Sequence, residues 1–97
     1  MLERLTIDDF RPLCGSTFRV LDPAVEIVLD RAVAVMESQR GRLSRQPFSL
    51  FFRGPSSPFL PQATYQMRHS AFGDVLTIFI VPVGRSGDAF EYEAVFT

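Results

Sequence analysis

Phe90-Glu-Tyr-Glu-Ala-Val-Phe96 is one of four short apolar stretches that decide the fold of this chain. Its aromatic and acidic residues alternate, which places the rings on one face of a strand and Glu91 and Glu93 on the other. The other three stretches are separated by turn residues and cover positions 48–52, 64–69 and 75–81. Each is long enough for a strand and too short for a stable helix. The C-terminal half is therefore predicted to form packed antiparallel sheet.

The N-terminal part is predicted to add a short helix and a strand. Thr6 is a candidate helix N-cap, and Asp9 occupies the acidic position of a capping box three residues later. Pro12 and Gly15 limit this helix to two turns, because proline interrupts a helix and glycine commonly ends one. Residues 17–21 then alternate as a strand.

Residues 23–36 carry two conflicting patterns. Asp22 as an N-cap and Pro23 at the first helical position favour a helix, which would extend over 23–38. Apolar, mostly β-branched residues instead occupy the odd positions from 25 to 35, interrupted only by Arg31. The favoured interpretation is a strand with a bulge near Asp30-Arg31, and the helix is the alternative.

Glycines and prolines separate the strands of the C-terminal half. The strand that begins at Phe48 is expected to end at Arg53, and residues 56–61 are expected to be irregular because their prolines remove backbone donors. Turns are expected at 70–74, with Gly73 placed for a positive-φ bend, and at 84–88.

These patterns predict one domain spanning residues 1–97. We expect a mainly β fold, a small antiparallel β-barrel or sandwich of about six strands with a short N-terminal helix. The alternative is an α+β fold with a helix at 23–38. Ten Phe and no Trp suit a filled interior, since Phe has no polar group that must find a partner.

The composition argues against several classes of partner. The net charge is −1, so the chain has no overall positive field to attract nucleic acid. Residues 37–46 carry Arg40, Arg42 and Arg45, and we interpret them as a solvated loop. Cys14 is the only cysteine, which excludes an internal disulfide and suits a reducing compartment. The N-terminus lacks the layout of a secretory signal, and the longest apolar run is too short to span a membrane, so we expect a cytoplasmic location without membrane association.

Several strings of the sequence resemble a known family. They are Leu5-Thr-x-x-Asp-Phe, Gly-x-Thr-Phe-Arg-Val at 15–20, Pro47-Phe-Ser-Leu-Phe-Phe-Arg-Gly-Pro55 and Tyr92-Glu-Ala-Val-Phe96. The chain resembles a family of small, uncharacterised bacterial single-domain proteins, a domain of unknown function. Its members are often encoded near proteins that resemble phage tail-collar or tail-fibre components. The resemblance implies a small, mainly β domain and supplies no catalytic residue.

The candidate ligand-binding residues are Arg53, Tyr65, His69 and Tyr92. Arg53 ends the most apolar stretch, and we interpret it chiefly as paired with a carboxylate or with backbone carbonyls that hold the 56–61 loop. His69 is the only histidine, so no conventional zinc site is expected. No glycine-rich phosphate-binding motif occurs, and we expect neither a cofactor nor a catalytic residue.

Three further groups have simpler interpretations. Cys14 is expected to be a small buried hydrophobe, since a catalytic pair with His69 would require the two to meet in space. Asp8 and Asp9 point apart on a helix and do not suit acid–base catalysis. The carboxylates of Glu91 and Glu93 are expected to face water; the alternative is a pair that binds a cation or contacts Arg53 or Arg68.

Two functions remain in contention. The favoured one is a non-enzymatic interaction or structural module that binds a partner protein or itself. Phe59 and Phe72 in predicted loops, and a C-terminal strand that would leave an edge for strand addition, favour it. The alternative is a small-ligand-binding β-barrel with a pocket near Arg53, Tyr65, His69 and Tyr92. An enzyme ranks third, because the sequence has no metal cluster or recognisable nucleophile turn.

Overall fold

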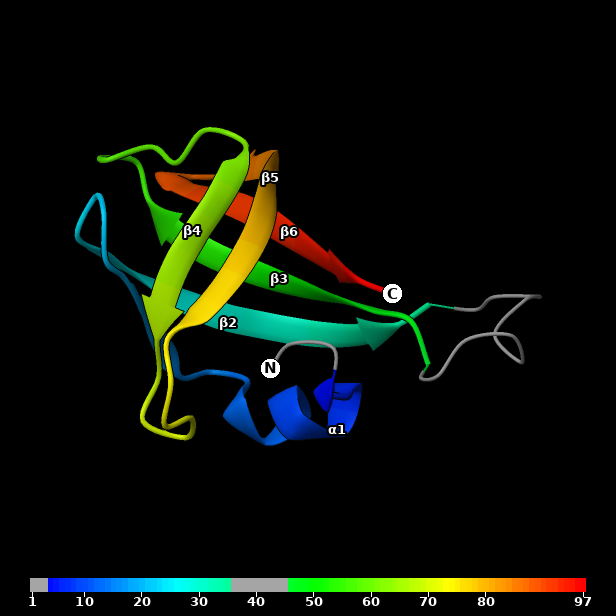
Figure 1. The fold of residues 1–97 in the computed structure, drawn as a ribbon. Coiled ribbons are helices and arrows are strands. Elements are labelled where there is room, and N and C mark those ends of the chain that lie inside the picture. The colour runs from blue at the N-terminus through cyan, green and yellow to red at the C-terminus, as the bar shows by residue number, and fades with distance from the viewer. Residues whose placement is uncertain (1–3, 36–45) are drawn as a thin grey trace.

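The structure is a computed structural model that describes residues 4–35 and 46–97. The short helix α1 (Ile7–Phe10) continues into the 3₁₀ turn η2 (Arg11–Leu13). The strands are β1 (Thr17–Val20), β2 (Val25–Ala34), β3 (Phe48–Pro55), β4 (Ala63–Arg68), β5 (Leu76–Ser86) and β6 (Ala89–Phe96). They form a closed antiparallel barrel in the order β1-β2-β3-β6-β5-β4 (Figure 1). The prediction of a mainly β barrel with a short N-terminal helix is confirmed.

The alternative helix at 23–38 is wrong over its described part. Residues 25–28 of β2 pair with β1, and residues 28–34 pair with β3. Residues 21–24 form a turn in which Asp22 and Pro23 precede the strand rather than cap a helix. Most of the predicted loop 37–46 lies outside the described residues.

The predicted bulge in β2 is confirmed at Asp30. The β2–β3 register shifts between Leu29 and Arg31, so that one extra residue stands in β2. Such a residue reverses the alternation of side chains beyond it. Ile27 and Leu29 are fully buried before the bulge, whereas Val33 is 42% exposed after it. The expectation that the odd positions share one face is therefore right before the bulge and wrong after it.

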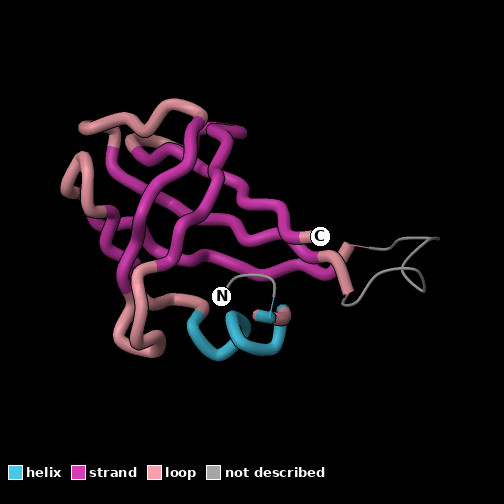
Figure 2. Tube along the Cα trace, viewed as in Figure 1, coloured by secondary structure: helices cyan, strands magenta, loops and turns pink. Residues whose placement is uncertain are grey.

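The barrel interior is filled by side chains from all six strands and from α1. Phe10 of α1 is fully buried, and its ring centroid lies 5.8 Å from that of Phe48, 5.5 Å from that of Phe96 and 5.6 Å from that of Phe72. The helical segments thus cover one end of the barrel (Figure 2). At the start of α1 the Thr6 N–H donates to the Asp9 carboxylate over 2.7 Å, which confirms the predicted role of Asp9.

Three strands run on beyond the crossing strands β4 and β5 toward the C-terminus (Figure 1). We call this part the three-strand extension and define it as residues 31–34 of β2, 48–51 of β3 and 93–96 of β6. Its strands are in register, as the cross-strand row Val33–Ser49–Val95 shows. The inner side of the extension packs on Phe10 through Phe48 and Phe96.

The barrel closes through a short seam between β1 and β4. Only two residue pairs form its ladder, Val20 with Met67 and Arg19 with Arg68. One further bond, from the Leu21 N–H to the Gln66 carbonyl at 3.0 Å, continues it. By comparison, β3 and β6 pair along residues 48–55 and 89–96.

Several predicted boundaries in the C-terminal half need correction. β3 does not end at Arg53 but continues through Gly54 and Pro55, which pair with β6. β5 likewise continues to Ser86, so the turn before β6 is shorter than the predicted 84–88. Gly73 does not have a positive φ, whereas Gly87 in the β5–β6 turn does, at 60°. The irregular 56–61 segment and the β4–β5 hairpin are as predicted.

The close packing around Gly54 gives a testable expectation. A Cβ at this position would lie 2.9 Å from Cγ2 of Ile27 and 3.4 Å from Cε2 of Tyr92, both fully buried side chains. We expect Gly54→Ala to lower the free energy of unfolding by about 1–3 kcal/mol, because the core must shift to accept a methyl group. Gly73→Ala is the matched control, since nothing lies within 4 Å of its Cβ position. Urea unfolding that gave equal losses for the two variants would contradict this packing.

Candidate functional site

Arg53 belongs to a chain of charged side chains on the outside of the barrel. Its Nη1 donates to the Asp30 carboxylate over 3.0 Å, and the same carboxylate accepts a 2.9 Å bond from Arg31. Arg31 also lies 3.4 Å from Glu91, and its guanidinium stacks over the Phe51 ring at 4.1 Å. The predicted pairing of Arg53 with a carboxylate is confirmed. Its bond goes to the bulge residue Asp30 and not to the 56–61 loop.

The acidic pair on β6 is divided between two partners. Glu91 pairs with Arg31, and Glu93 accepts a 2.8 Å bond from the Ser49 hydroxyl. The alternative contacts with Arg53 or Arg68 are therefore not the ones observed, and the partners come from β2 and β3. Because each carboxylate has its own neighbour, the two do not converge on one cation.

Tyr65 and Tyr92 both hold the irregular loop that precedes β4. The Tyr92 hydroxyl accepts a 3.1 Å bond from the Leu60 N–H, and both residues are buried. The Tyr65 hydroxyl donates to the Pro61 carbonyl over 2.6 Å. Two successive loop residues are thus fixed by the two tyrosines of the chain. This use of both hydroxyls is structural, since prolines prevent the loop from forming its own ladder.

His69 follows β4 and bonds through both ring nitrogens. Its Nδ1 accepts the Ala71 N–H over 2.9 Å, so in the neutral ring the proton is on Nε2. Nε2 lies 2.8 Å from Oγ of Ser16, and this hydroxyl donates to the Leu13 carbonyl. His69 Nε2 must therefore donate to Ser16. This arrangement is the reverse of a nucleophile–base pair, in which the histidine would accept the hydroxyl proton.

Cys14 differs from its expected environment. It lies between η2 and β1 and is exposed, so the prediction of a buried hydrophobe is wrong. Its neighbour Gly15 has a φ of 91° and donates to the Leu29 carbonyl over 2.7 Å. The glycine turn that leads the chain into β1 leaves the cysteine side chain outside the core.

The depressions whose lining belongs to the described residues do not bring the four candidate ligand-binding residues together. One shallow surface depression contains Arg53, and a second contains His69; Tyr65 and Tyr92 line neither. Within the described residues, no three side chains of His, Cys, Asp or Glu gather to hold a metal ion. The described part of the chain also contains no helix with the length and hydropathy that a membrane span requires.

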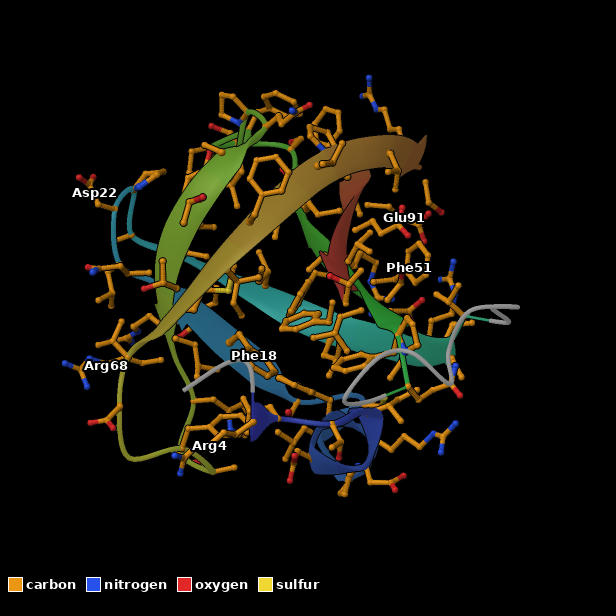
Figure 3. The ribbon with its side chains drawn as sticks, turned by 45° about the vertical axis from the view of Figure 1, so that its right-hand side comes forward. Arg4, Phe18, Asp22, Phe51, Arg68 and Glu91 are labelled. Atoms are coloured by element: carbon orange, nitrogen blue, oxygen red, sulfur yellow. The ribbon has the colours of Figure 1, made fainter. Side chains whose placement is uncertain are left out.

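A different group of residues stands out on the outer side of the three-strand extension. Val33 is 42% exposed and Val95 60% exposed, and they flank Ser49 in one cross-strand row. Phe51 lies in the next row and points outward on the side that also carries Glu91 (Figure 3). We call Val33, Phe51 and Val95 the outer apolar face. Val95 alternates with Glu91 and Glu93, so the sequence predicts that it faces outward. The outward orientation of Val33 can be predicted only when the bulge is taken into account.

The two tyrosine clamps are expected to differ in strength. Tyr92→Phe leaves the Leu60 N–H buried without its partner, which costs about 1–3 kcal/mol of unfolding free energy. Tyr65→Phe frees the carbonyl of the exposed Pro61, which water can reach, so a loss below about 1 kcal/mol is expected. Urea unfolding of both variants measures which one loses more unfolding free energy. An equal or reversed order would show that the Leu60 bond is not the stronger clamp.

Because of the Tyr65 phenol, we expect the free energy of unfolding to decrease at alkaline pH. Burial raises the pKa of Tyr65 above its ordinary value of 10.0, and the nearby Tyr92 raises this pKa further. Because the folded-state pKa is the higher one, the contribution to stability is complete below pH about 10 and decreases as the pH rises above it. In Tyr65→Phe the decrease should be smaller. Unfolding midpoints measured across this range test the expectation, which fails if both proteins lose stability equally.

Comparison with known proteins gives a family without an assigned activity. Residues 5–96 match the family described as domain of unknown function (DUF6916). No curated protein and no solved structure matches the chain. The match covers all six strands and α1. The chain therefore belongs to the DUF6916 family of domains of unknown function.

Proposed function

We propose that this domain is a non-enzymatic protein-interaction module whose binding surface is the outer apolar face. The observation that carries the proposal is the exposure of Val33 and Val95 side by side across Ser49. Single exposed valines are ordinary, but here two flank the buried Ser49 in one row, next to a half-buried Phe51, and together they form an apolar strip on one face. Covering such a strip removes apolar surface from water and stabilises a complex.

The occupant that we propose is a second copy of the chain. The apolar strip is bordered by a row that carries both signs of charge, with Arg31 and Glu93 on either side of Phe51. A twofold contact brings the same patch of two copies together, so a patch with apolar and mixed-charge parts can be complementary to itself. Other protein partners are outcomes that the experiment below separates.

Two features of the sequence analysis now support the proposal less than before. Phe72 is not an exposed loop ring, because it packs on Phe10. The last strand lacks the expected edge over residues 89–93, where β6 lies between β3 and β5, whereas residues 94–96 extend past the β5 ladder. Phe59 is 42% exposed, and its ring packs edge to face with the Phe90 ring, with a centroid separation of 4.8 Å. The proposal therefore rests on the outer apolar face and not on strand addition.

The assembly that we propose is phage-tail-like or appendage-like. Its support is the resemblance noted above, which implies that family members are often encoded near proteins that resemble tail-collar or tail-fibre components. The twofold contact joins two copies of the barrel, and we propose that this pair is the unit that enters such an assembly. We further propose a cytoplasmic location for the folded domain, in keeping with the single exposed thiol of Cys14.

The alternative of a small-ligand-binding barrel has less support. Closed barrels of this size usually fill with side chains, and here eighteen hydrophobic residues form one buried cluster. The two tyrosines that were candidates for the pocket use their hydroxyls on the 60–61 backbone. A ligand inside the barrel would have to displace these contacts.

Sedimentation over a range of protein concentrations tests the proposed self-association. The double variant Val33→Ser/Val95→Ser should weaken the dimer at least tenfold, since removing buried apolar area costs about 25 cal/mol per Å² and about 1.4 kcal/mol corresponds to tenfold in affinity. Val83→Ser is the matched control, because Val83 is 46% exposed on β5 and lies off the face.

The outcomes separate the occupants. A concentration-dependent dimer that is lost only in the double variant supports the proposal. A wild-type protein that stays monomeric at millimolar concentration excludes a second copy. If cross-linking in native cells then detects a complex that the double variant loses and Val83→Ser retains, the face binds another protein. Absence of both kinds of complex overturns the interaction function.

A further inference from the structure

The seam that closes the barrel places two arginines opposite each other. Arg19 of β1 and Arg68 of β4 are register partners, and both side chains are exposed. Residues that face each other across an antiparallel pair have Cβ atoms about 4.5–5.5 Å apart, and like charges in this position are destabilising. This pair is one of only two in the β1–β4 ladder. The repulsion therefore acts where the barrel has the fewest bonds.

The charges around this pair are only partly balanced. Arg19 has Glu26 as its register partner on the other side, with Nη2 3.4 Å from the carboxylate. Among the described residues, no carboxylate lies within salt-bridge distance of Arg68, whose side chain points away from the barrel (Figure 3). The two arginines and Glu26 together carry one net positive charge.

A surface depression lies directly over this pair. Its lining includes Arg19 and Arg68 together with the hydroxyl-bearing residues Thr17 and Ser70 and the carboxylate of Glu26. His69 also lines it, but both of its ring nitrogens are occupied by Ala71 and Ser16. The groups that can meet an anion are the guanidinium of Arg68, the guanidinium of Arg19, which also contacts Glu26, and two exposed hydroxyls.

We infer that this depression is a binding site for an oxyanion, a carboxylate or phosphate group held between Arg19 and Arg68. A guanidinium presents parallel N–H donors that match the paired oxygens of such groups. Hydroxyls of Thr17 and Ser70 can donate to further oxygens. Glu26 opposes the anion and the depression is open, so the affinity expected for a free ion is in the millimolar range, as for a weak charge pair near the surface.

Binding of the anion would also strengthen the seam. With an anion between them, the two arginines no longer repel but share a ligand, so the β1–β4 pairing becomes more favourable. A ligand that binds only the folded protein stabilises it in proportion to the logarithm of its concentration. The site lies opposite the β3–β6 pair in the closed strand order, so its occupation does not depend on the proposed self-association.

Thermal unfolding with inorganic phosphate tests the inference. In wild-type protein, phosphate should raise Tm more than chloride at the same ionic strength, and backbone amide NMR signals of residues 17, 19, 68 and 70 should shift together. Arg68→Gln should weaken phosphate binding at least tenfold. Without phosphate it should be at least as stable as wild type, because it removes the like-charge pair. Arg11→Gln, at another exposed arginine, is the control and should respond to phosphate as wild type does.

A second binding experiment identifies the source of the anion. A short glutamate-rich peptide that binds at least tenfold more tightly than phosphate, and loses this advantage in Arg68→Gln, assigns the site to acidic protein segments. Equal binding of peptide carboxylates and phosphate assigns it to free oxyanions. The inference is overturned if phosphate and chloride act alike on the wild type, or if Arg68→Gln retains the phosphate response.

Discussion

The strand β2 pairs with β1 at its start and with β3 along most of its length, and the bulge between Leu29 and Arg31 bends it between these two regions. The bulge directs Ile27 and Leu29 into the core and turns Val33 outward. It also presents the Asp30 carboxylate to Arg31 and Arg53 at 2.9 and 3.0 Å. One extra residue thus organises the outer charges and turns Val33, one of the three residues of the outer apolar face, outward.

The polar side chains nearest the core form hydrogen bonds mainly with backbone groups. Few polar atoms therefore remain for chemistry inside the barrel. Tyr92 and Tyr65 hold the Leu60 N–H and the Pro61 carbonyl, and His69 accepts the Ala71 N–H while it donates to Ser16. Every buried side-chain nitrogen and oxygen among the described residues has a partner. Since an unpaired buried polar group is costly, these contacts explain why the interior can be dense and still irregular at the 56–61 loop.

Local sequence patterns were sufficient to predict that the strands, the capping box and the bulge exist, because each depends on neighbours in sequence, although the ends of β3 and β5 were misplaced. Alternation correctly placed Tyr92 inside and Glu91 outside. What it could not supply were contacts between distant segments. Pairing of Glu91 with Arg31, the use of Tyr92 by Leu60 and the exposure of Cys14 depend on which strands become neighbours when the sheet closes. The register opposition of Arg19 and Arg68 has the same origin.

A closed barrel with a filled interior can only bind through its surface, and the two surfaces described above differ in what folding requires of them. Val33 and Val95 lie outside the buried core, so part of their apolar surface remains in water in the monomer. Arg19 opposite Arg68 is unfavourable for the monomer, because it weakens the shortest ladder of the sheet. Proteins depart from the rules of a stable fold mainly at functional sites. A partner at the outer apolar face and an anion between Arg19 and Arg68 would each account for one such departure.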